Sequence, residues 1–122
     1  MSPSPTQYSG YRSESRAALW LQDQGLHVLA RNLYCRSGEI DLVARDGAVL
    51  VFVEVRYRRS PSHGGAAASV NRRKQQRLMR AARYFLPRLA RQHFQGRLPA
   101  CRFDVIGFEA DTVQWIKHAF ME

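Results

Sequence analysis

Long apolar runs and grouped cysteines are both missing from this chain, and each absence excludes a class of protein. No apolar stretch approaches the ~20 residues that a bilayer-spanning helix needs, so we expect no membrane segment. The first residues, Met1–Gln7, have neither the charged start nor the apolar run of a secretory signal. The two cysteines, Cys35 and Cys101, form no CxxC or CxxxC group, which favours buried thiols over a disulfide. Together these absences predict a cytoplasmic protein.

Acidic residues are also scarce, and none lies between Val55 and Phe103. The chain has 19 Lys and Arg against 10 Asp and Glu, a net charge of +9, and 17 of the 19 basic residues are arginine. A solvated helix would normally mix the two signs to gain i,i+4 pairs. Because arginine suits bidentate contacts with phosphate, the unanswered positive charge predicts a nucleic-acid partner. The basic residues of this span are Arg56, Arg58, Arg59, Arg72, Arg73, Lys74, Arg77, Arg80, Arg83, Arg88, Arg91, Arg97 and Arg102.

Length limits the architecture to one domain, because 122 residues bury a single core and leave no room for a second domain of ordinary size. Residues 1–9 are dominated by Ser, Pro and Thr, so they are predicted to be a disordered tail. Residues 10–122 then form the domain.

The central feature of the chain is a predicted β-hairpin around Asp46-Gly47. Runs rich in β-branched and apolar residues flank this pair, which favours a two-residue turn. With these two residues in the turn, Glu39 lies opposite Glu54 and Asp41 lies opposite Phe52. A bulged three-residue turn would change this matching.

Strand alternation puts Glu39, Asp41, Glu54 and Arg56 on one face of the hairpin. The other face is continuously apolar and is predicted to enter the core; it carries Ile40, Leu42, Ala44, Val49, Val51, Val53 and Val55. Two like charges roughly 5 Å apart repel by about 3 kcal/mol at an effective dielectric near 20, so the three acids require compensation. Metal, Arg or Lys, or a shared proton can supply it, and oxygen ligands favour Mg²⁺ or Mn²⁺. The alternative is three solvated acids neutralised by nearby arginines.

A helix is predicted from about Tyr11 to Gln24, with Ser13 as a possible N-cap and Gly25 ending it in the left-handed conformation. Glu14 lies in its first turn, near the edge of the apolar side. It could reach the carboxylates of the hairpin, or it could simply complement the helix dipole.

A second helix is predicted after Ser69, its expected N-cap, and it has one apolar and one basic side. Its predicted core stripe is Leu78, Ala82, Phe85, Leu86 and Leu89. Because Pro87 fits poorly inside a helix, we expect a kink or break near Phe85–Leu86. The preceding segment, 58–65, is rich in Pro, Gly and Ser and is predicted to be an exposed loop.

Three further strands are predicted at Leu26–Tyr34, 102–108 and 113–117. The resulting order, αβββαββ, indicates an α/β fold with a mixed sheet flanked by helices.

Three motifs carry a resemblance to a known family. GEIDLVARDG at 38–47, LVFVEVR at 50–56 and RFDV at 102–105 resemble the bacterial YraN family, also called UPF0102, over nearly the whole chain from about Tyr11 to Phe120. That family is similar to archaeal Holliday junction resolvases and other nucleases of the PD-(D/E)XK type. The resemblance implies a restriction-endonuclease-like core.

The resemblance also implies roles for individual residues. Asp41 looks like the acid of the nuclease pattern, Glu54 like the acid of its E-x-K half, and Glu14 like an acid carried by a helix. Arg56 stands where the catalytic lysine belongs. An arginine stays protonated and cannot act as a base, although it can still position water and steady a phosphate.

A metal site follows from the same resemblance. Asp41, Glu54 and the carbonyl of Val55 would hold one or two Mg²⁺ or Mn²⁺ ions, with Glu39 as a possible extra ligand. The implied activity is metal-dependent endonuclease cleavage of branched or structured DNA in repair or recombination, with a homodimer possible by analogy. The alternatives are a non-catalytic nucleic-acid-binding protein on the same scaffold and an adaptor for an acidic protein. Residues expected to contact the nucleic-acid backbone are Arg58, Arg59, Arg72, Arg73, Lys74, Arg77 and Arg80.

Overall fold

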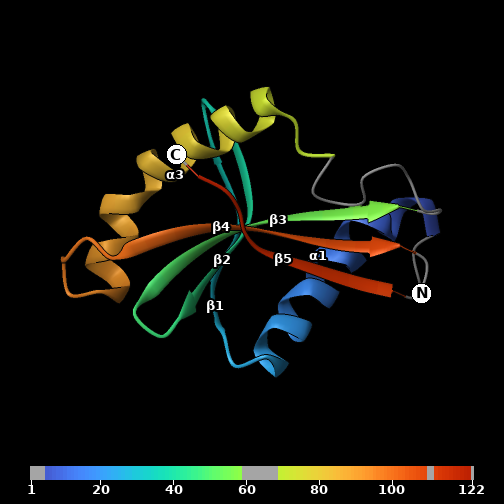
Figure 1. Ribbon diagram of the computed structural model, residues 1–122, viewed down its shortest axis with the longest axis horizontal. Helices are drawn as coiled ribbons and strands as arrows, with labels where there is room; N and C mark the ends of the chain where they lie inside the picture. The colour runs from blue at the N-terminus through green and yellow to red at the C-terminus, as the bar shows by residue number, and fades with distance from the viewer. Residues whose placement is uncertain (1–4, 59–68, 110–111, 122) are drawn as a thin grey trace.

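The computed structural model of the protein describes residues 5–58, 69–109 and 112–121. In this part of the chain five strands form one sheet in the order β1-β2-β3-β4-β5, with β3 and β4 parallel and the other neighbours antiparallel (Figure 1). The elements are α1 (Pro5–Asp23), β1 (His27–Cys35), β2 (Gly38–Asp46), β3 (Val49–Arg58), α3 (Arg72–His93), β4 (Ala100–Glu109) and β5 (Thr112–Phe120). The predicted α/β fold with a mixed sheet is confirmed.

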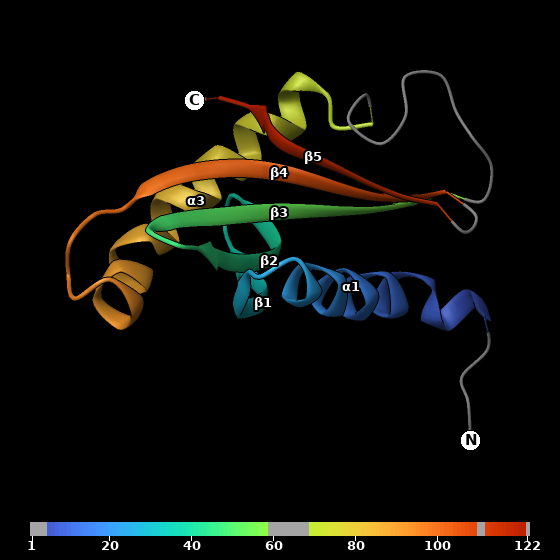
Figure 2. The same ribbon diagram turned by 60° about the horizontal axis from the view of Figure 1, so that its bottom comes forward.

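The two long helices cover opposite faces of the sheet, so both faces of the central hairpin are buried (Figure 2). Helix α1 packs through Ala17, Ala18 and Leu21 on one face, over Leu42, Ala44, Val51, Val53, Ile106 and Phe108. Helix α3 packs on the other, over Val43, Leu50, Phe52, Phe103 and Val105. The core stripe predicted for α3 is confirmed, with Ala81 and Ala90 added to it and Leu86 only half-buried.

The predicted hairpin exists, but its turn lies one residue further along. Asp46 pairs with Val49, and the regular ladder runs up to Leu42 opposite Val53. The predicted pairing of Glu39 with Glu54 is therefore wrong. The observed turn puts Gly47, with φ 59°, first of its two residues, and Asp46 is also linked to β4 by Arg102, whose Nη1 lies 2.9 Å from Asp46 Oδ2. Since the register moves by two positions, the side chains within the regular ladder keep their faces.

The ladder ends where the acidic residues begin. Beyond Leu42, the Asp41 carboxylate accepts the Val55 N–H at 2.9 Å. Ile40 packs with the α3-side core instead of sharing a face with Leu42 as predicted, because the strands have left the regular ladder there.

Helix α1 starts earlier than predicted, at Pro5, so the segment expected to be a tail is helical from that residue and Ser13 lies inside the helix. Proline is well suited to this first helical position, where its missing N–H would have no partner within the helix. The helix ends at Asp23, and Gly25 has φ 95°, which confirms the predicted left-handed end.

Helix α3 also differs from its prediction at two points. Its N-cap is Asn71, not Ser69, and the Asn71 side chain accepts the Lys74 N–H at 2.9 Å. The helix continues through Pro87 to His93, so the predicted break does not occur. Buried packing on either side of the proline, by Phe85 and Leu89, holds the helix together there.

Three other predictions concern single segments. Cys35 and Cys101 are not joined in a disulfide, as expected, but both are half-buried instead of buried. None of the helices in the described part of the chain is both long and apolar enough to cross a membrane. The predicted loop at 58–65 lies outside the described residues apart from Arg58, which ends β3.

Candidate active site

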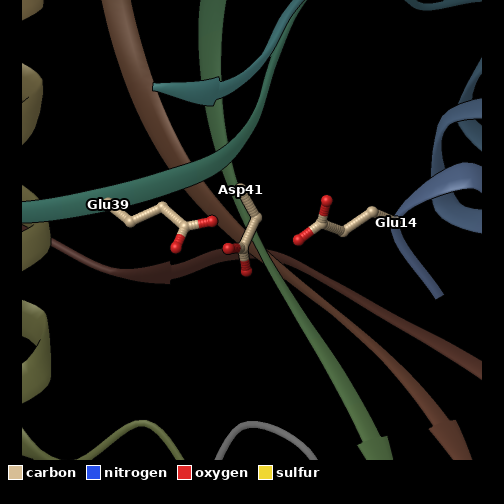
Figure 3. Close-up of side chains that lie close together, drawn as sticks. All are labelled: Glu14, Glu39 and Asp41. Carbon is tan, nitrogen blue, oxygen red and sulfur yellow. The ribbon is translucent and has the colours of Figure 1, made fainter. Parts of the chain in front are cut away.

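Four carboxylates from three elements converge at the end of the β2–β3 ladder. Glu14 comes from α1, Glu39 and Asp41 from β2, and Glu54 from β3. One carboxylate oxygen of each of Glu14, Glu39 and Asp41 lies within 4.8 Å of the other two. Figure 3 shows these three side chains turned toward one another, with Glu14 reaching in from the helix. The alternative in which Glu14 only complements the dipole of α1 does not account for this arrangement.

Local structure explains how the acids come together. Helix α1 is fixed on the sheet by Ala17 and Ala18, one turn after Glu14, which puts the Glu14 carboxylate over the end of the hairpin. In β1, Asn32 has φ 52° and its side chain hydrogen-bonds to Glu14. Asp41 is held in turn by the Val55 N–H.

Glu54 is the most enclosed member of the group. Its side chain is only 5% exposed, and Oε2 has no hydrogen-bond partner among the described residues. The nearest cation is Lys74 Nζ, at 3.5 Å from that oxygen. A buried carboxylate oxygen without a hydrogen bond is costly, so Lys74 compensates the charge of Glu54 only in part.

The group holds its protons more tightly than isolated acids do. Burial, together with the neighbouring Glu54 carboxyl, raises the pKa of Asp41 to about 8, although the Val55 N–H and Lys74 act in the opposite direction. Burial and the charge of Asp41 also raise the pKa of Glu39 and of Glu14. At neutral pH the site therefore takes up a proton unless another cation replaces it.

A small open pocket of about 80 Å³ connects the acids with α3. Glu39 and Asp41 lie on one wall, and Lys74 and Arg77 lie on the other. One wall of the pocket can therefore bind a cation while the other binds an anion.

Comparison with known proteins gives the family. The family described as "Uncharacterised protein family UPF0102" matches residues 13–108. This chain belongs to the UPF0102 family. It is 57% identical to UPF0102 protein Bpet0439 of Bordetella petrii, over 96% of this chain and 72% of that protein. It is 52% identical to a UPF0102 protein of Klebsiella pneumoniae (89% and 83%) and 49% identical to UPF0102 protein YraN of Escherichia coli (94% and 86%).

Among the residues singled out in this UPF0102 protein, the basic ones divide into two groups. Arg72, Arg73, Arg77 and Arg80 are exposed on α3, whereas Lys74 is turned toward the acids. Arg58 ends β3, and Arg59 lies outside the described residues.

Arg56 lies two residues after Glu54 on β3, but it is not the cation beside Glu54. Its Nε is buried and has no hydrogen-bond partner among the described residues. The contact between Lys74 and Glu54 was missed by the sequence analysis, because it depends on how α3 packs on the sheet.

A second buried carboxylate, Asp104, was also missed. It is fully buried and accepts Arg102 Nε, Arg102 Nη2, Trp115 Nε1 and the His118 N–H at 2.9 to 3.1 Å. This group holds the irregular pairing of β4 with β5, where the register shifts between Phe103 and Val105. Because protein donors satisfy both oxygens of Asp104, its role is structural.

Proposed function

We propose that this UPF0102 protein is a metal-dependent endonuclease that hydrolyses phosphodiester bonds in branched or structured DNA. One observation carries the proposal: Glu54 Oε2 is buried with no hydrogen-bond partner among the described residues, beside Asp41, whose pKa is raised to about 8. A pair of carboxylates that must either share a proton or bind a cation is suited to metal chemistry.

The donor set fits a hard divalent cation. Asp41 and Glu54 would hold Mg²⁺ or Mn²⁺ with the carbonyl of Val55, and Glu39 is close enough to Asp41 to add an oxygen. A bound ion of this kind lowers the pKa of a water ligand and stabilises charge on a phosphate. Glu14, which lies across Asp41 from Glu39 in Figure 3, can accept a proton from water at the same site.

The basic surface of α3 suits the proposed substrate. The exposed Arg73, Arg77 and Arg80 lie at three- and four-residue steps on one side of the helix, and Arg77 also lines the acidic pocket. Such contacts bind the phosphate backbone and set its position without reading bases, which suits recognition of DNA shape. A homodimer would present two such sites to a symmetric junction, and reduced Cys35 and Cys101 suit the cytoplasm.

The experiment is a cleavage assay on labelled duplex, flap and four-way-junction DNA, and on matching RNA, with Mg²⁺, Mn²⁺ or EDTA. Asp41→Asn and Glu54→Gln should each reduce the cleavage rate by about 100-fold or more, because each removes a proposed ligand. Asp23→Asn, an exposed acid at the end of α1, is the matched control and should cleave normally. Cleavage that survives unchanged in both site variants would exclude the assigned site.

Arg56 favours a second candidate, a non-catalytic nucleic-acid-binding protein on the same scaffold. Its guanidinium cannot accept a proton at any ordinary pH. The position on β3 where related nucleases would have their catalytic lysine therefore carries no general base. This candidate predicts salt-dependent binding to DNA without cleavage in any metal.

A further inference from the structure

Lys74, the cation nearest the buried Glu54, lies on α3, an element that carries none of the four acids. Lys74 lies in the first turn of α3, where its backbone N–H donates to the Asn71 side chain at 2.9 Å. The main chain of Lys74 is thus fixed by the helix cap, while Nζ lies at the end of a flexible four-carbon side chain. The ammonium group can move without any change in the fold.

The Lys74 and Glu54 side chains differ in exposure, and this difference allows Lys74 to move. Glu54 is 5% exposed, whereas the Lys74 side chain is 37% exposed on the wall of the acidic pocket. Their closest atoms are 3.5 Å apart, longer than the usual 2.7–2.9 Å for a charge-assisted hydrogen bond. Lys74 therefore offsets the charge of Glu54 without satisfying the hydrogen bond of its oxygen.

A divalent cation and the Lys74 ammonium compete for the same carboxylates. Lys74 acts on Asp41 and Glu39 as well as on Glu54, so it serves as the counter-ion of the whole group. A divalent ion bound by Asp41 and Glu54 would repel the ammonium and remove its partner. The pocket into which Lys74 would then turn also contains Arg77, which makes it a site for an anion.

We propose that Lys74 couples metal binding to phosphate binding: Glu54 holds it in the metal-free protein, and a divalent cation releases it to contact the DNA phosphate at the site. This inference rests on the proposed function, because it assumes that the acids bind a metal. Lys74 then supplies, from α3, the positive charge beside Glu54 that Arg56 on β3 does not supply. Since coupling is reciprocal, DNA must raise the affinity for metal by the same factor.

The first test measures metal binding without DNA. Mn²⁺ titration of the full chain, followed by calorimetry, should give about fivefold or more tighter binding for Lys74→Gln than for the wild type, since the competing ammonium is gone. Lys74→Arg keeps the charge and should stay near the wild type. Arg80→Gln, on the exposed side of α3, should not change the Mn²⁺ affinity.

The second test measures the affinity for a labelled four-way junction in EDTA and in Ca²⁺, by fluorescence anisotropy. Ca²⁺ should strengthen binding by about tenfold for the wild type but by less than about threefold for Lys74→Gln. Arg80→Gln should weaken binding to a similar extent in both buffers, as expected for a plain backbone contact.

The outcomes separate this proposal from the proposed function. If the wild type binds neither Mn²⁺ nor Ca²⁺, the metal site itself is wrong. If the wild type binds metal but Lys74→Gln shows unchanged Mn²⁺ affinity and full coupling to DNA, only the role of Lys74 is overturned. A circular-dichroism melt of each variant checks that it is folded, and Lys74→Met, which also removes the charge, replaces Lys74→Gln if that variant does not fold.

Discussion

Replacing Asp41 with asparagine should make the metal-free protein more stable at alkaline pH. Asparagine keeps the bond from the Val55 N–H, because its side-chain oxygen can accept at the same place. It removes one negative charge from a group in which the oxygens of Glu14, Glu39 and Asp41 lie within 4.8 Å of one another. Without a bound cation, that negative charge lowers the free energy of unfolding.

The size of the effect follows from the pKa of Asp41, which burial and the Glu54 carboxyl raise from 3.8 to about 8. The native state then keeps a proton that the unfolded state has lost, so the free energy of unfolding is highest below the unfolded pKa and falls as the pH rises toward about 8. Each pH unit in this window costs about 1.4 kcal/mol. Between pH 5 and pH 8 the wild type should therefore lose up to about 4 kcal/mol relative to Asp41→Asn.

Urea unfolding of both proteins in EDTA, at pH 5 and pH 8, measures this difference. The four histidines titrate in both proteins, so comparing the two variants isolates Asp41. Adding Mn²⁺ at pH 8 should reverse the order, because the metal stabilises only the protein that binds it. The reasoning fails if the two proteins differ equally at both pH values, or if Mn²⁺ stabilises Asp41→Asn as much as the wild type.

Three further predictions concern stability and can be checked by the same unfolding measurements. Arg102→Ala should destabilise the protein by about 3–5 kcal/mol, because it leaves the fully buried Asp104 without its charged partner; a loss under 1 kcal/mol would contradict this. Leu89→Ala should cost about 2–5 kcal/mol, since Leu89 is 1% exposed between α3 and the sheet, whereas a change at the exposed Leu98 should cost far less. Asn71→Ala should cost about 1 kcal/mol by removing the helix cap, and Asn71→Ser should restore most of it.

Much of the fold follows from local patterns in the sequence. The alternation of apolar residues identified the strands and, except at Ile40, the faces of the hairpin, and the spacing of Leu78, Ala82 and Phe85 identified the buried side of α3. The hairpin register did not follow, because the Asp46-Gly47 signal is satisfied by either turn position. Only the structure shows which turn forms, and in it Arg102 of β4 contacts Asp46.

For the site, the sequence by itself indicated that Asp41 and Glu54 share a face of the hairpin, because side chains alternate along a regular strand. The break in this alternation at Ile40 was visible only in the tertiary structure. Only the tertiary structure decided that Glu14 reaches those acids and that Lys74, not Arg56, lies beside Glu54. Glu14 and Lys74 are on helices α1 and α3, whose positions depend on packing against opposite faces of the sheet. Periodicity within a helix shows which side of it is buried, but not which distant strand end that side will face.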